Sequence, residues 1–135
     1  MIVVDASIAL AWCFADERDA YAERILDRVT RESAVAPAHW PLEVANGLRT
    51  GERLGRIDVE GVSRVSRLLN DLGIEIVPVE LSTATGTVLD AAREHDLTTY
   101  DAVYLGLASF RGLPLATIDA ALAAACRRAG VELAT

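Results

Sequence analysis

Short apolar runs alternate with longer segments of helical spacing along the whole chain. The runs are rich in β-branched residues, which predicts strands at residues 2–5, 34–37, 74–79, 115–118 and 131–133. Strands that are apolar throughout, with helices between them, are typical of a parallel sheet that is covered on both faces. The sequence therefore predicts an α/β fold, and it contains no internal repeat or linker.

The segments between these strands have helical periodicity and recognisable ends. Aspartates at three of the starts can cap a helix, and glycines can stop several of the helices. The predicted helices cover residues 7–14, Asp16 to Arg31, Pro41 to Gly51 or Gly55, Asp58 to Gly73, Ser82 to His95, residues 97–109 with Gly112 as the stop, and Asp119 to Arg128.

The segment from Leu97 to Ser109 is the most informative of these helices. Its apolar residues are too dense for a helix with one face in water, and its polar residues gather at the beginning. Thr98 or Thr99 can cap the helix there, and Asp101 falls in its first turn. A carboxylate at this position is stabilised by the helix dipole and can stay ionised near other carboxylates. Taken alone, Asp101 is better explained as a residue that only helps the helix to start.

The length and composition indicate one globular domain over residues 1–135, with 52% hydrophobic residues. This excludes a disordered chain. The charge-free runs are too short to span a bilayer, and the N-terminus lacks the pattern of a signal peptide. Cys13 and Cys126 lie far apart, without the spacing of a metal or redox site. We expect a cytoplasmic protein without membrane association.

The net charge of −7 argues against a nucleic-acid partner, because phosphate repels acidic surfaces. Two features weaken that argument. Acids gathered in one pocket would bind cations and reverse the local field. In addition, every basic side chain apart from histidine is arginine, which suits bidentate contacts to phosphate. Charge alone leaves a nucleic-acid partner open.

Four acidic residues stand where strands end or helices begin. Asp5 ends the first strand, Glu43 begins the helix after the second, Asp101 lies in the first turn of its helix, and Asp119 follows the strand at 115–118. In a parallel sheet these positions can share the edge where ligands bind. Each acid alone could be only a helix cap. Together they would repel one another unless a cation lay among them, and their hard oxygen ligands suit Mg²⁺ or Mn²⁺.

A metal site of this kind most naturally serves phosphodiester hydrolysis by metal-activated water. It requires no side-chain nucleophile, and the sequence offers none. His39 and His95 have no metal-ligand or triad spacing; His39 could touch a substrate or serve the structure. The chain has no glycine-rich phosphate loop, which argues against nucleotide hydrolysis of that type.

The sequence resembles the PIN-domain family, and within it the VapC toxins of bacterial toxin–antitoxin modules. The resemblance covers essentially the whole chain and is carried, in the order and spacing of that family, by residues 3–10, 36–46, 97–108 and 113–122. It implies a three-layer α/β/α sandwich and a divalent-metal-dependent endoribonuclease. By position, Asp5, Glu43, Asp101 and Asp119 match the acidic quartet of the family, with Asp5 and Asp101 the principal metal ligands. Ser7 and Thr117 match polar residues that hold the carboxylates.

The resemblance also implies partners. Such toxins cut a structured RNA, often tRNA or rRNA, at a single-stranded loop, where the bases are unstacked. Arg49, Arg53 and Arg56 are candidates for phosphate contacts; the alternative is that they form only a solvated helix end. A homodimer is implied, as is a VapB-type antitoxin that places a basic side chain in the acidic pocket.

Two other functions fit parts of the sequence. A haloacid-dehalogenase-type phosphatase also begins with a strand that ends in Asp, but its mechanism uses a second Asp two residues on, where this chain has Ser7. A non-enzymatic module could use the same acids to dock a basic partner. Metal binding separates that module from a nuclease. A receiver-like domain fits less well, because the N-terminus has no paired acids and the chain has no lysine.

Overall fold

The computed structural model describes residues 1–135 and has a parallel sheet of four strands at its centre. The strands lie in the order β3-β2-β1-β4, and every neighbouring pair is parallel. Their bounds are Ile2–Val4 for β1, Ala34–Pro37 for β2, Glu75–Val77 for β3 and Leu115–Ala116 for β4. The predicted strand at 131–133 is reduced to one parallel bridge, between Leu115 and Leu133. The predicted α/β fold is confirmed.

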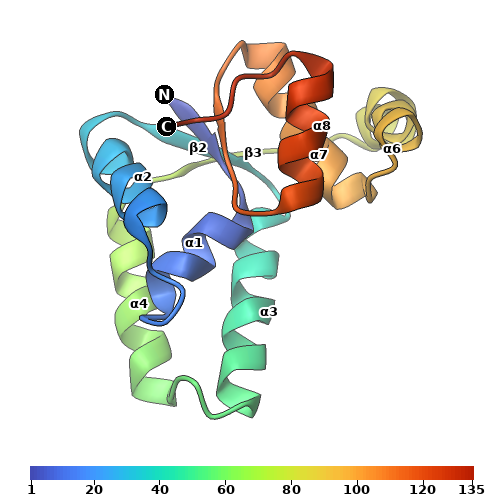
Figure 1. Ribbon diagram of the computed structural model, residues 1–135. Helices are drawn as coiled ribbons and strands as arrows, with labels where there is room; N and C mark the ends of the chain where they lie inside the picture. Colours follow the sequence, from blue (N-terminus) through green and yellow to red (C-terminus); the bar gives the residue numbers. More distant parts are fainter.

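Helices cover both faces of this sheet, as Figure 1 shows, with α1 to α4 on one side and α6 to α8 on the other. The three-layer α/β/α architecture is therefore confirmed. None of the helices combines the length and the apolar character needed to cross a bilayer. The helices are α1 (Ala6–Cys13), α2 (Ala20–Arg31), α3 (Trp40–Arg53), α4 (Val59–Asp71), α5 (Leu81–Thr83), the π-helical η1 (Ala84–Val88), α6 (Leu89–His95), α7 (Thr99–Arg111) and α8 (Ala120–Ala129).

Aspartate side chains cap several of these helices. Asp58 and Asp119 each accept a hydrogen bond from the backbone N–H three residues further on, at 2.7 and 2.8 Å, as predicted for α4 and α8. The prediction that Asp16 caps α2 is wrong, because Asp19 is the cap. The chain turns after α1, and Asp16 pairs instead with Arg56, at 2.9 Å.

The segment predicted as one helix from Ser82 to His95 consists of α5, η1 and α6. Gly86 lies in the middle of the π-helical turn, flanked by threonines. Glycine and β-branched residues weaken an α-helix, and the Thr85 hydroxyl also donates to the Leu81 carbonyl at 2.9 Å. These local effects explain why the regular helix is interrupted.

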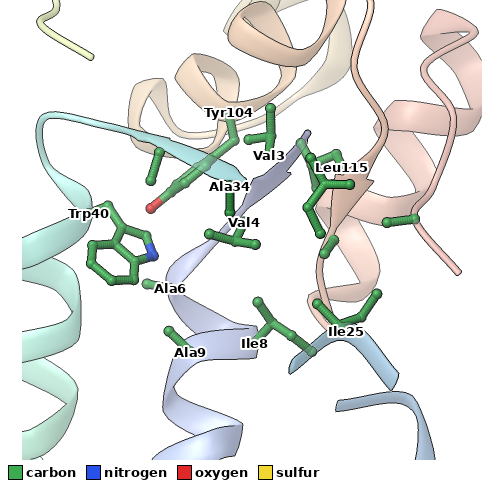
Figure 2. Packing of buried hydrophobic residues seen from close by; sticks show 14 of the residues in the cluster. Val3, Val4, Ala6, Ile8, Ala9, Ile25, Ala34, Trp40, Tyr104 and Leu115 are labelled. Atoms are coloured by element: carbon green, nitrogen blue, oxygen red, sulfur yellow. The ribbon is translucent and has the colours of Figure 1, made fainter. Parts of the chain in front are cut away.

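The hydrophobic core surrounds β1, whose three residues are fully buried. Helix α7 packs across the sheet, and no residue from Asp101 to Ala108 is exposed, as its apolar density predicts. Figure 2 shows Tyr104 of α7 beside Val3 and Ala34, with its hydroxyl directed toward the side where Trp40 lies. The edge strand β3 departs from the expectation of strands covered on both faces, because two of its three residues are exposed.

Candidate active site

The order of the strands determines where the chain can form a ligand site. The chain runs outward from β1 through β2 to β3 and then returns to place β4 on the other side of β1. Open parallel sheets bind ligands at such a reversal, beyond the carboxyl ends of the strands. Asp5 follows β1, and Thr117 to Asp119 follow β4, so these residues flank the reversal.

Asp5 is the most buried of the four acids, with 4% of its surface exposed. Its Oδ1 atom accepts hydrogen bonds from the Ser7 hydroxyl at 2.7 Å and from the Ile8 backbone N–H at 3.1 Å, while Oδ2 accepts one from the Thr117 hydroxyl. Burial raises the pKa of Asp5 to about 6, and the charge of Asp119 adds to the rise, although the hydrogen bonds oppose it. Ser7 and Thr117 hold this carboxylate.

The same hydroxyl groups connect the end of β1 to the start of α8. The Thr117 hydroxyl accepts a hydrogen bond from the Asp119 backbone N–H at 2.9 Å, and the Ser7 hydroxyl accepts one from the Ile118 backbone N–H at 3.1 Å. The Oδ1 atom of Asp119 caps α8. The carboxylates of Asp5 and Asp119 are thereby fixed relative to one another by short polar contacts.

Asp101 lies in the first turn of α7, where Thr98 is the N-cap and accepts from the Asp101 backbone N–H at 3.2 Å. Its side chain is half-buried. Burial raises the pKa of Asp101, and the charges of Asp119 and Glu43 raise it further. Asp101 therefore lies within electrostatic reach of two other members of the quartet.

Glu43 is held by two aromatic residues. The Tyr104 hydroxyl donates to Oε1 of Glu43 at 2.7 Å, and Nε2 of His39 lies 3.2 Å from the same oxygen. Burial alone would raise the pKa of Glu43, but the hydrogen bonds from His39 and Tyr104 outweigh it and the pKa is lowered. Nε2 of His39 also lies 3.0 Å from the Tyr100 carbonyl oxygen. Both neighbours of Nε2 are acceptors, so this nitrogen carries the hydrogen.

Sequence reasoning did not assign His39 and Tyr104 to the support of Glu43. A signal was present for His39, which stands four residues, about one helical turn, before Glu43. The contact between Tyr104 and Glu43 joins α7 to α3, and that long-range packing has no local signature in the sequence.

The charge at this edge of the sheet is not balanced. Asp5, Asp101 and Asp119 form no ion pair, and the only basic group at Glu43 is His39. As the side chains stand, no three His, Cys, Asp or Glu residues are grouped closely enough to hold a metal ion. The chemistry of the donors nevertheless fits Mg²⁺ or Mn²⁺, because carboxylates share one edge: the charge of Asp119 adds to the raised pKa of Asp5, and the charges of Asp119 and Glu43 add to that of Asp101.

The three arginines predicted to contact phosphate lie away from the acids. Glu43 lies in the first turn of α3, and this helix runs away from the sheet (Figure 1). Arg53 is therefore on the order of 15 Å along the helix from Glu43. Arg49 pairs with Glu52 at 3.1 Å, and Arg56 pairs with Asp16 at 2.9 Å. Arg53 is exposed and forms no ion pair.

Fold and site together define a three-layer α/β protein with carboxylates gathered beyond the carboxyl ends of its strands. The family model of the PIN domain matches residues 2–135. The chain therefore belongs to the PIN domain family, and the predicted resemblance to VapC-type members is confirmed. It is 31% identical over 125 residues to Ribonuclease VapC3 of Pyrobaculum aerophilum, an alignment that covers 90% of this chain and 92% of that protein.

A solved structure shows the same architecture. The crystal structure of PAE2754 from Pyrobaculum aerophilum matches with a TM-score of 0.70 and 30% sequence identity, covering 92% of this chain and 78% of that chain. The fold expected from the sequence is thus found in an experimentally determined relative.

Proposed function

We propose that this chain is a VapC-type endoribonuclease, the toxin of a VapBC-type toxin–antitoxin module, and that it hydrolyses phosphodiester bonds in RNA with Mg²⁺ or Mn²⁺. The observation that carries the proposal is the set of four carboxylates without arginine partners at the reversal of the sheet. They occur in a chain that is 31% identical to a protein named as a ribonuclease. Its place of action is the cytoplasm, in agreement with two free cysteines.

Asp5, Glu43, Asp101 and Asp119 are the residues that would hold the metal. A bound divalent ion supplies a Lewis acid for the phosphate and lowers the pKa of the attacking water. The protein contributes preorganisation: Ser7 and Thr117 fix the carboxylate of Asp5. Tyr104 and His39 occupy one oxygen of Glu43 and leave Oε2 without a protein donor.

Arg53 is the arginine best placed to contact substrate phosphate, because its guanidinium is exposed and unpaired. Arg49 and Arg56 would have to exchange a carboxylate for a phosphate. The proposed substrate is a structured RNA such as tRNA or rRNA, cut in an unpaired region where the backbone can bend toward the carboxylates.

Two protein partners belong to the proposal. A VapB-type antitoxin would bring a basic side chain to the quartet, and the lack of any arginine at Asp5, Asp101 and Asp119 supports this role. A homodimer is supported by an apolar cavity of about 450 Å³ between α7 and the segment from Val77 to Val88, with Phe110 91% exposed at its rim.

The test is cleavage of total cellular RNA by the antitoxin-free protein in Mg²⁺, Mn²⁺ or EDTA. Asp101→Asn is compared with Asp71→Asn, a matched loss of one carboxylate at an exposed residue at the end of α4. We expect a discrete fragment that requires metal, disappears with Asp101→Asn and persists with Asp71→Asn. Cleavage that survives in Asp101→Asn or in EDTA would contradict the proposal. Metal binding without cleavage of any RNA would favour a phosphatase. Absence of both metal binding and cleavage would favour a docking module.

A further inference from the structure

One exposed aromatic ring stands at the acidic edge of the sheet. The chain has seven Phe, Tyr and Trp residues (two, three and two), and among them only Tyr100 and Phe110 are exposed. They lie near opposite ends of α7, and Tyr100 is the residue directly before Asp101. Its side chain is 62% exposed. Packing of the hydrophobic core does not explain why a large planar side chain is exposed to water at this position.

Tyr100 is also held in place. Its carbonyl oxygen lies 3.0 Å from Nε2 of His39, and its ring leans on the His39 ring with 5.6 Å between centroids and 49° between the planes. The His39 ring packs in turn edge-on against buried Tyr104, with 5.0 Å between centroids. Three rings thus run from the core to the surface. A ring supported in this way loses little further freedom when it binds a ligand.

The surroundings of Tyr100 select what it can bind. Asp101 follows it in the chain, and the His39 ring on which it leans contacts Glu43 through Nε2, so the immediate neighbours of Tyr100 include one acid and the partner of a second. A phosphate group would be repelled at this position, whereas a neutral planar group would stack on the ring. An unpaired nucleobase has the right chemistry, and stacking on an aromatic ring tolerates any base. A base inside a duplex has both faces covered and cannot stack in this way.

We propose that Tyr100 is a stacking platform for an unpaired nucleobase that flanks the phosphodiester bond at the quartet, an inference that rests on the proposed ribonuclease function. The platform gives the site a preference for single-stranded RNA that four carboxylates alone would not provide. It also supplies binding energy at an edge where Asp5, Asp101 and Asp119 have no arginine partner.

Substrate kinetics test the role of the ring. With cleavable RNA and Mg²⁺, Tyr100→Ala should raise KM by about 5- to 150-fold, which corresponds to the 1–3 kcal/mol of one stacked base. Tyr100→Phe keeps the ring and should stay within about twofold of the parent. Leu68→Ala removes an exposed apolar side chain from α4 and is the matched control, with no expected change. A Tyr100→Ala variant with unchanged KM, or a Tyr100→Phe variant as defective as Tyr100→Ala, would overturn the proposal.

A binding measurement separates this inference from the nuclease function. Single-stranded oligoribonucleotides of random sequence carrying 2-aminopurine are titrated with Asp5→Asn protein, with and without Tyr100→Ala, in Mg²⁺. Quenching that depends on Tyr100 and disappears when the strand is made duplex supports stacking, even if the parent protein cleaves no RNA. Cleavage by the parent together with quenching independent of Tyr100 refutes the platform and leaves the nuclease intact. Absence of both cleavage and Tyr100-dependent quenching refutes both.

Discussion

The two ends of α3 use the same residue types in opposite ways. At its beginning Glu43 belongs to an edge with three further carboxylates and no arginine. At and just beyond its far end two of the three arginines have acidic partners: Arg49 pairs with Glu52, and Arg56 pairs with Asp16 and stacks on the Phe14 ring, 4.3 Å from its centroid. Carboxylates near the far end of α3 have arginine partners, and those of the quartet have none.

This difference has an energetic meaning. Exposed ion pairs such as Arg49–Glu52 contribute about 0–1 kcal/mol each, so the pairs at the far end of α3 change the free energy of unfolding little. At the acidic edge the raised pKa values of Asp5 and Asp101 show that the folded chain disfavours their charged forms. Carboxylates whose charged forms are disfavoured in the folded chain indicate a site for a cation. Substitutions can test that interpretation.

The largest expected effect is loss of cleavage in Asp5→Asn and Asp101→Asn. Each change removes one of the proposed anionic metal ligands, and we expect a rate loss of about 1,000-fold or more, as several kcal/mol of transition-state stabilisation disappear. RNA cleavage measures the effect, and circular dichroism confirms the fold. Glu52→Gln at the far end of α3 is the control. Activity within tenfold of the parent in either variant would show that the two ends of α3 do not differ in function.

The second effect is a pH dependence of stability in the metal-free protein. The pKa of Asp5 is about 6 when folded and 3.8 in its ordinary state, so the folded chain binds the extra proton between these values. Its contribution to stability is therefore fully present below pH 3.8 and is lost as pH rises through about 6, by about 2–3 kcal/mol. Urea titrations at pH 5 and pH 7.5 measure about half of this decline, about 1.4 kcal/mol.

Other groups set the lower limit of that pH window. The pKa of Glu32 is lowered to about 2, mainly by a hydrogen bond from Arg28, so its contribution is present above pH 4.5 and is lost as pH falls toward 2. From these two groups the expected maximum lies near pH 4, where the gain from Glu32 and the loss from Asp5 cancel. Asp5→Asn should flatten the decline above pH 5 and stabilise the protein at pH 7.5. A decline of equal size in Asp5→Asn would assign it to other groups.

A smaller effect is expected from Tyr104→Phe. The change removes the 2.7 Å hydrogen bond to Glu43 and keeps the packing of the ring in the core. We expect kcat/KM to fall by about tenfold, equivalent to about 1.4 kcal/mol, because Glu43 is less firmly positioned. A double-mutant cycle with Glu43→Gln provides the control. The same tenfold loss in the Glu43→Gln background would mean that Tyr104 acts through another residue.

The smallest effect compares a free arginine with a paired one. Arg53→Gln should weaken RNA binding a few-fold and lower the salt slope by about 0.7, the value for one contact to a single-stranded phosphate. Arg56→Gln should change the slope less, because its guanidinium is paired with Asp16. Binding at several salt concentrations measures both variants. Equal salt slopes for the two variants and the parent would show that the end of α3 does not contact RNA.

The sequence predicts the parts of this protein that depend on local chemistry. The apolar runs at β1 and β2, the caps Asp58 and Asp119, and the stop at Gly112 each act over a few residues. Gly112 adopts a φ of 63°, which glycine tolerates best and which ends α7. The positions of the four acids at strand ends and helix starts also follow from this local pattern.

The parts that sequence reasoning missed depend on contacts between distant segments. The hydroxyl of Tyr104 reaches Glu43 across 61 positions of the chain, and Nε2 of His39 reaches the Tyr100 carbonyl across 61. Asp16 was expected to cap α2 because it precedes the helical pattern, but it pairs with Arg56, 40 positions away. Such pairings depend on how α3 packs against its neighbours, which periodicity alone does not specify.

The most direct test of the central claim is calorimetric titration of the RNA-free and antitoxin-free protein with Mn²⁺, in parallel with Asp101→Asn and Asp71→Asn. The account predicts saturable binding in the parent and in Asp71→Asn, and its loss or a severe weakening in Asp101→Asn. Binding of equal affinity in all three proteins, or no binding in the parent, would show that the carboxylates at the reversal of the sheet do not form a metal site.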